Sequence, residues 1–121
     1  MISPYVVPGL KGILLTSLAT NFKVEALKEV LLEYNLKRQP KRYTWKDVQG
    51  QSRKRELVLL RHMYCYLCMK YRLFSSQGAV GDTIGGRDHT TIIHSCQTIQ
   101  DQIDTQNAAT IDLLTYINNN L

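Results

Sequence analysis

No apolar run in this chain approaches the roughly 18 residues that a membrane-spanning helix needs. The longest apolar stretch near the start is Ile13-Leu14-Leu15. Met1 to Leu10 has neither a basic n-region nor an apolar h-region, so no signal peptide is expected. The three cysteines are an odd number, whereas secreted disulfide frameworks favour even numbers. These absences predict no membrane association and a location in the reducing cytoplasm.

Catalytic arrangements are missing as well. The sequence holds no phosphate-binding loop of the form GxxxxGK[ST], so a P-loop ATPase is excluded and no nucleotide is expected. We find no set of nucleophile, base and orienting residue, and no pair of carboxylates among apolar neighbours. We therefore expect a protein that is not an enzyme and that uses no cofactor.

Charge is distributed unevenly along the chain. The whole sequence carries +5, but residues 37–72 hold eleven basic and two acidic side chains, a net +9, and the remainder sums to −4. From Gln97 to the C-terminus there is no lysine or arginine. A one-sided basic region on a small domain is typical of a polyanion binder. Two alternatives are an ordinary solvated basic surface and an anionic membrane, which would require an amphipathic helix with large apolar residues opposite the basic ones.

Helical periodicity dominates the hydrophobic pattern. The 121 residues, 44% of them hydrophobic, suffice for one domain with one core. We expect this domain over 22–121, after a partly irregular extension over 1–21 with a short helix at 11–18. The predicted helices are Phe22–Tyr34, Trp45–Val48, Ser52–Tyr71, Ser75–Ile84, Asp88–Thr105 and Asn107–Asn119, with Asn21, Thr44, Ser52 and Asp88 as N-caps. The predicted fold is therefore all-α, with five or six helices around one core.

The predicted helices have inward faces at helical spacing. The residues expected to face the core include Val24, Leu27, Leu31 and Tyr34 in the first helix, Leu57, Leu60, Tyr64, Leu67 and Tyr71 in the long helix, Ile92, Cys96, Ile99 and Ile103 in the next, and Ile111, Leu114 and Ile117 in the last.

A short helix, the Gly85-Gly86 turn and a longer helix form the layout of a helix-turn-helix. Glycine adopts positive φ without a Cβ clash, so the second helix can turn sharply away from the first. That helix opens Asp88-His89-Thr90-Thr91, and the start of a recognition helix normally meets base edges. These side chains suit cytosine amino and thymine methyl groups. The structural alternatives also stay open, with Asp88 as a cap, the threonines as ordinary first-turn residues and His89 as a surface histidine.

The segment from Gly85 to Cys96, GGRDHTTIIHSC, closely resembles the signature of the C-terminal DNA-binding domain of the bacterial replication initiator DnaA. Val80-Gly81-Asp82 is similar to the family's residues before the turn, and Ser52-Arg53-Lys54-Arg55 is similar to its basic loop. The likeness covers about 22–121 and is tight only over 80–99. It implies a helix-turn-helix domain of the DnaA domain IV, or Trp-repressor-like, type and a nucleoid location in the cytoplasm.

The resemblance also implies how the chain would meet double-stranded DNA. The start of the recognition helix would read the major groove of a DnaA box, while the basic loop would enter the adjacent minor groove, whose negative potential attracts arginine. The implied major-groove readers are Asp88, His89, Thr90 and Thr91; the minor-groove or basic-loop residues are Arg53, Lys54 and Arg55; the contacts to DNA backbone or bases are Arg61, His62, Arg87 and Ile93. The expected function is sequence-specific duplex binding in replication initiation or its regulation.

Departures from the family pattern leave a second function open. Leu59-Leu60 stand where the family often has a basic residue and a proline, Met69 replaces a usual lysine, and Gln97-Thr98 replace a usual basic pair. Fewer phosphate anchors favour the alternative of a protein-interaction module that docks on a replication protein with weak or lost DNA specificity. RNA is a weaker third candidate, because the A-form major groove is too narrow for a recognition helix.

The spacing of His62, Cys65 and Cys68 invites comparison with a zinc site. Metal-binding CxxC pairs usually lie on a turn with a second ligand pair about 12–20 residues away. Here they lie inside a predicted helix, and His94 and Cys96 have the wrong spacing for the second pair. We therefore expect no metal and an inert, buried Cys96.

Overall fold

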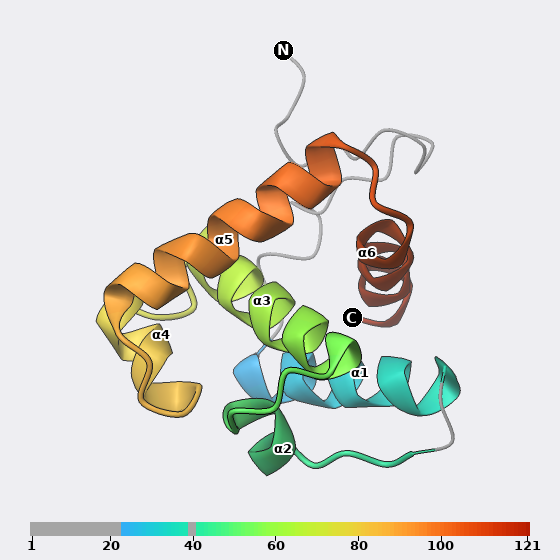
Figure 1. Cartoon of the computed structure of the whole chain (residues 1–121), viewed down its shortest axis with the longest axis horizontal. Coiled ribbons are helices and arrows are strands. Elements are labelled where there is room, and N and C mark those ends of the chain that lie inside the picture. The colour runs from blue at the N-terminus through green and yellow to red at the C-terminus, as the bar shows by residue number, and fades with distance from the viewer. Residues whose placement is uncertain (1–22, 39–40) are drawn as a thin grey trace.

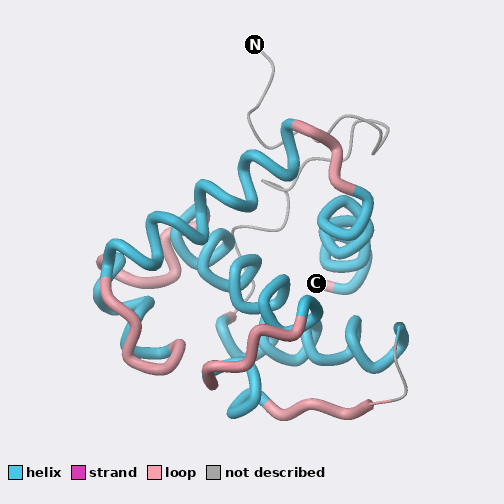
Figure 2. The backbone as a smooth tube through the Cα atoms, in the orientation of Figure 1, coloured by secondary structure: helices cyan, strands magenta, loops and turns pink. Residues whose placement is uncertain are grey.

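The computed structural model describes residues 23–38 and 41–121. Within these ranges the chain forms six helices and no strand (Figure 1, Figure 2). The helices are α1 Val24–Arg38, α2 Trp45–Gln49, α3 Arg55–Lys70, α4 Gln77–Thr83, α5 His89–Asp104 and α6 Ala108–Asn120. The prediction of an all-α fold with five or six helices is confirmed. The short helix expected over 11–18 and the Asn21 cap lie outside the described residues.

The central element of the domain is α3, which lies between α1 and α5 and also packs against α2 and α4 (Figure 1). Its side chains are buried on almost every face: Leu57, Leu60, Arg61, Met63, Tyr64, Cys65, Tyr66, Leu67 and Cys68. Because the surroundings are apolar, burial raises the pKa of both Cys65 and Cys68 to about 12. These two thiols therefore act as small core side chains. No group of three or more His, Cys, Asp or Glu in the described ranges could hold a metal ion.

The first helix runs past its predicted end at Tyr34 and continues to Arg38. The reason lies in α6, where Asp112 Oδ2 accepts hydrogen bonds from the Tyr34 hydroxyl at 2.8 Å and from Arg38 Nε and Nη2 at 2.9 and 2.7 Å. Lys37 and Arg38 also place positive charge at the C-terminal end of the helix dipole. Contacts with a distant segment thus stabilise a last turn that has no apolar periodicity of its own.

The start of α3 also differs from the prediction. Thr44 caps α2 as expected, in a reciprocal capping box with Asp47. Ser52 does not cap α3, which begins at Arg55 after Lys54. The Ser52 hydroxyl instead accepts from the backbone N–H of Lys54 at 3.3 Å. Such a local side-chain to backbone bond competes with helix formation, so residues 51–54 form a loop rather than a first helical turn.

The buried face of α6 is rotated relative to the prediction. Leu114 and Ile117 are buried as expected, but Leu113 is also fully buried, whereas Ile111 is only half-buried. Thr110, also buried, donates its hydroxyl proton to Gln102 Oε1 of α5 at 2.6 Å. Val24, Tyr71 and Cys96 are likewise half-buried at the edge of the core.

None of the helices in the described ranges is both long enough and apolar enough to cross a membrane.

Candidate nucleic-acid interface

A sharp turn between α4 and α5 sets the direction of the longer helix. Gly85 and Gly86 have φ values of +84° and +71°, a region in which a Cβ is unfavourable. Gly81 in α4 allows the backbone of Arg87 to approach closely. The Gly81 carbonyl accepts a hydrogen bond from the backbone N–H of Arg87 at 3.0 Å. A Cβ on Gly81 would lie closer than 3.0 Å to the Arg87 carbonyl. The GG turn and the preceding glycine are therefore steric requirements of the helix-turn-helix.

The side chain of Asp88, one of the residues predicted to read bases, caps the first turn of α5. Asp88 Oδ1 accepts from the Thr91 backbone N–H at 2.9 Å, and this hydrogen bond lowers the pKa of Asp88. The side chain remains exposed, as are His89, Thr90 and Thr91. The cap accounts for one carboxylate oxygen of Asp88, so capping and an outward contact are compatible.

The two faces of α5 have opposite character. Its inward face buries Ile92, Ser95, Ile99 and Ile103 against the rest of the domain. Its outward face exposes the first turn together with Ile93, 48% exposed, and His94. The outward face is therefore available to a partner along the N-terminal two turns of the helix.

Exposed cations occupy the loop that precedes α3. Arg53, Lys54 and Arg55 are all exposed. Lys54 and Lys41 lie over the ring of Tyr43, with their ammonium nitrogens 5.9 and 5.4 Å from its centroid. The neighbouring Lys54 lowers the pKa of Lys41. The fold thus holds positive charges together, which is an arrangement that an anion would stabilise.

Two arginines that were predicted to contact DNA, Arg61 and Arg87, bind the protein's own backbone in the structure. Arg61 is buried, 8% exposed, and its Nε and Nη1 donate to the carbonyls of Val48 and Ser52 at 2.7 and 3.1 Å. The Arg87 guanidinium donates to the carbonyls of Ile84, of Gln49 at 2.9 Å and of Gly50 at 2.5 Å. Both guanidiniums are engaged with the protein's own backbone rather than directed into solvent.

His62 joins α3 to the recognition helix. Its ring is half-buried, and Nδ1 lies 2.8 Å from the Ser95 hydroxyl of α5. Burial, together with His94 and the nearby Arg61 and Arg87, lowers the pKa of His62 below its ordinary value of 6.5. The neutral imidazole is therefore the form that suits this helix–helix contact.

The lowered pKa of His62 predicts a loss of stability in mild acid. Between the folded and the unfolded pKa the unfolded chain binds more protons, so stability is fully present above about pH 6.5 and is lost as the pH falls through the folded value. We expect the urea midpoint to be lower at about pH 5.5 than at about pH 7.5, and the change to shrink in His62→Gln, which cannot titrate. An equal pH response in both proteins would assign the effect to other groups.

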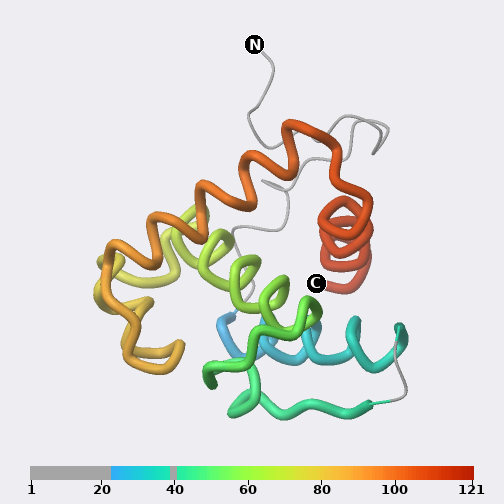
Figure 3. The backbone as a smooth tube through the Cα atoms, in the orientation of Figure 1, coloured from blue at the N-terminus to red at the C-terminus, as the bar shows by residue number. Residues whose placement is uncertain are grey.

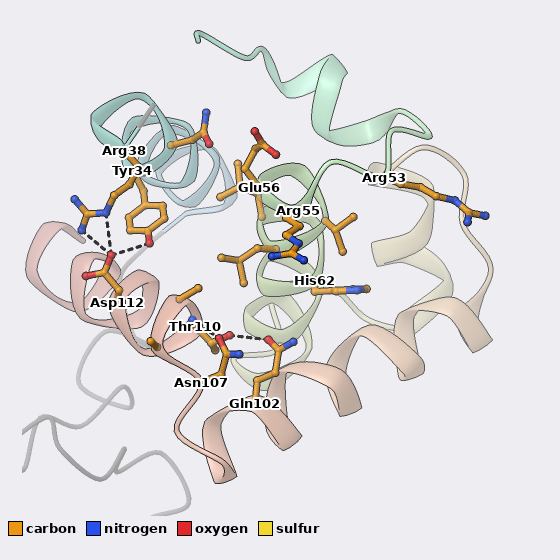
Figure 4. A pocket seen from close by; sticks show the side chains of 16 residues that line it. Tyr34, Arg38, Arg53, Arg55, Glu56, His62, Gln102, Asn107, Thr110 and Asp112 are labelled. Atoms are coloured by element: carbon orange, nitrogen blue, oxygen red, sulfur yellow. Dashed lines mark hydrogen bonds and ion pairs between the residues drawn. The ribbon is translucent and has the colours of Figure 1, made fainter. Parts of the chain in front are cut away.

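A groove of about 980 Å³ lies beside the basic loop, between α1, α3, α5 and α6. Figure 4 shows Arg55 and His62 in this groove, with the Tyr34–Arg38–Asp112 cluster at its far side. Arg53 also lines the groove, but its side chain points outward from it. Arg53 and Arg55 thus point in different directions, although they are only two residues apart.

The turn before α5 and the loop after α2 lie side by side although they are far apart in the sequence (Figure 3). The side-chain amide of Gln49 donates to the carbonyl of Thr83 at 2.9 Å, and Arg87 bonds the same segment. The recognition helix and the basic loop therefore belong to one rigid surface. Sequence reasoning identified both parts but not the residues that join them.

Comparison with known proteins identifies relatives of this chain by sequence. Residues 42–99 match the family described as "Bacterial dnaA protein helix-turn-helix". The chain is 32% identical over 108 residues to the chromosomal replication initiator protein DnaA of Borrelia turicatae, which covers 87% of this chain and 21% of the relative. It is 39% identical over 57 residues to DnaA of Bacteroides thetaiotaomicron, covering 47% of this chain and 12% of the relative. The chain spans about a fifth or less of the length of these curated relatives. The helical domain described here belongs to the DNA-binding helix-turn-helix family of bacterial DnaA proteins.

Proposed function

We propose that this domain binds duplex DNA sequence-specifically, reads DnaA-box-like sites and acts in replication initiation or its regulation. The observation that carries the proposal is the pairing of an exposed polar helix start, Asp88 to Thr91, with an exposed basic loop, Arg53 to Arg55. The residues just before each segment, the turn at 83–87 and the end of α2 at 49–50, are hydrogen-bonded to each other. Base edges provide specificity, and phosphates provide orientation and affinity.

The recognition helix supplies the chemistry for major-groove reading. Its first-turn side chains are short and polar, so they can approach base edges closely. The backbone N–H groups at the same end, and the positive end of the helix dipole, favour a nearby phosphate. Because α5 has 16 residues and a core-facing side fixed by Ile92 and Ile99, its start is held rigidly.

The basic loop supplies the second contact. Arg53 is exposed and its side chain extends outward from the loop (Figure 4), and arginine inserts readily into a narrow minor groove. Lys54 and Lys41, which both lie over the ring of Tyr43, add positive charge to the same region of the chain. Arg61 and Arg87, which bond the protein's own carbonyls, are not part of the proposed DNA-contacting set.

Selection of bound sites from random duplex DNA tests the proposal most directly. We expect a recurrent short motif with fixed spacing between a major-groove and a minor-groove element. Recovery of duplexes without a common motif would contradict sequence-specific reading. In that case, a contact with a replication protein that survives nuclease treatment would favour the docking function.

Replacing Thr91 is expected to reduce sequence discrimination rather than general affinity. Thr91→Ala should lower the preference for the selected site over random duplex by about 1–3 kcal/mol, because a hydroxyl and a methyl that face bases are lost. His89→Ala should act in the same direction, whereas Arg53→Ala should weaken binding with less effect on major-groove discrimination. Competition binding with the two duplexes measures this.

Thr105→Ala is the matched control, because Thr105 is an exposed threonine at the opposite end of the same helix. It should leave the ratio of the two affinities unchanged. Equal losses on specific and random duplex for Thr91→Ala would remove Thr91 from the base-reading set.

A further inference from the structure

We infer that Arg87 and Arg61 are positioning residues that fix the offset between the basic loop and the recognition helix. The inference rests on the proposed function and deepens it, because it assigns two arginine side chains of the interface region to geometry rather than to DNA contact. Its basis is a set of side-chain to backbone hydrogen bonds that converge on one short segment, residues 48–52.

The end of a helix leaves carbonyl groups without intrahelical partners. Arg87, which follows the glycine turn before α5, provides such partners for the carbonyls at the end of α2. The contact between this turn and the end of α2 is called the junction below. Its Nη1 donates to the Gln49 carbonyl at 2.9 Å and its Nη2 donates to the Gly50 carbonyl at 2.5 Å. Nη1 also bonds the Ile84 carbonyl in the turn before α5. One guanidinium therefore connects the helix-turn-helix turn to the start of the basic loop.

Arg61 holds the same segment from α3. Its Nε and Nη1 donate to Val48 and Ser52 at 2.7 and 3.1 Å, so its two bonds bracket those of Arg87. Every hydrogen bond of either guanidinium in the described ranges goes to a main-chain oxygen. The planar fork of arginine suits such multiple contacts, whereas a lysine ammonium cannot reproduce them.

Two further contacts make the junction close-packed. Gln49 Nε2 donates to the Thr83 carbonyl at 2.9 Å. A Cβ on Gly85 would lie closer than 3.0 Å to the Gln49 carbonyl and 2.7 Å from Arg87 Nη1. The turn and the loop therefore meet backbone to backbone, with little room for either to shift.

The functional consequence follows from DNA geometry. A protein that reads the major groove with one segment and the adjacent minor groove with another must hold the two segments at a fixed separation, because the grooves are fixed relative to each other. Neither segment is continuous with the other in the sequence. The two arginines provide the connection, and their hydrogen bonds to main-chain carbonyls occupy the guanidinium donors that a phosphate would otherwise use.

The test uses Arg87→Lys, which keeps the charge and loses the fork, on duplexes carrying the selected site. Replacing adenine with diaminopurine at individual A·T pairs adds an amino group to the minor groove only. We expect this change to weaken binding of the unsubstituted protein by about tenfold at the pair read by Arg53. In Arg87→Lys the diaminopurine substitution should weaken binding by less than about threefold, because the basic loop is no longer held in a fixed position relative to the recognition helix. Non-specific affinity should stay unchanged.

Hydrogen exchange provides a readout that does not depend on DNA. Amides of residues 51–54 should exchange faster in Arg87→Lys, while those in the middle of α3 keep their protection. Arg38→Lys is the matched control, because Arg38 also makes two side-chain hydrogen bonds between elements, to Asp112, away from this junction. It should leave both the loop amides and the diaminopurine effect unchanged.

Several outcomes would overturn the inference. Unchanged exchange at 51–54 in Arg87→Lys would show that the loop does not depend on Arg87. A uniform loss on all duplexes for Arg87→Ala, with a salt slope smaller by about one, would make Arg87 a phosphate contact instead. If Arg87→Lys does not fold, Gln49→Ala tests the same junction, and unchanged loop exchange there would overturn the inference. Failure of the proposed function is distinguishable, because the unsubstituted protein would then select no motif.

Discussion

Gly81→Ala is expected to destabilise the domain by about 3 kcal/mol or more and to lower the melting temperature by roughly 10 °C. The added Cβ would lie closer than 3.0 Å to the Arg87 carbonyl oxygen and 2.9 Å from its carbon. Both are backbone atoms, so no rotamer change can relieve the clash. The Gly81 carbonyl also accepts from the backbone N–H groups of Ile84 and Arg87, at 3.1 and 3.0 Å, and the movement needed would strain these bonds.

Gly78→Ala is the matched control in the same helix. Gly78 is exposed, and a Cβ there would meet only Ser76 Oγ, at 3.8 Å. Because alanine favours helix over glycine, this change should be neutral or stabilising by up to about 1 kcal/mol. Thermal and urea unfolding of the two variants measure the difference. Similar stabilities for both would show that α4 can move away from the turn at little cost.

Strong salt dependence is the second large effect that we expect. Six cations on or near the basic loop are exposed: Lys41, Arg42, Lys46, Arg53, Lys54 and Arg55. If four to six phosphates are neutralised, the logarithm of the binding constant should fall with the logarithm of the salt concentration with a slope near −4 to −5. Between about 50 and 200 mM salt, this slope corresponds to a roughly 250- to 1,000-fold loss of affinity.

Two further arginines are already engaged within the protein and should not add to the slope. Arg38 is paired with Asp112, and Arg61 is buried against carbonyls, so neither adds to the number of phosphate contacts. Filter binding across a salt series, on the selected site and on random duplex, measures the slope. A response that is nearly flat on both duplexes would remove duplex DNA as the partner. The residues from Gln97 onward carry no basic side chain and should make no contribution to the slope.

Local signals in the sequence were sufficient for the recognition helix. The Asp88 side chain caps α5 as predicted, and Ile92, Ile99 and Ile103 are buried at the predicted spacing. The Gly85-Gly86 turn has the positive φ values that this residue type permits. The Thr44 capping box of α2 was equally local. Each of these features depends on residues a few positions apart, whose chemistry is visible in the chain itself.

Local signals were misleading where a distant segment decided the outcome. Ser52 has the chemistry of an N-cap but forms a loop contact, and α1 extends to Arg38 because Asp112 accepts its hydrogen bonds. Arg61 and Arg87 look like exposed DNA contacts in a basic sequence, yet they bind backbone carbonyls at the end of α2 and in the loop that follows it. A sequence pattern gives the type of donor but not the acceptor that folding brings to it.

The sequence by itself determined an all-helical domain, the position of its helix-turn-helix and the polar start of the recognition helix, because periodicity, capping and glycine conformations are properties of neighbouring residues. The tertiary structure decided which arginines face solvent and how the basic loop lies against the turn before α5. Those features depend on hydrogen bonds between Arg87 and residues 37 or 38 positions away, and such pairings exist only once the core has formed.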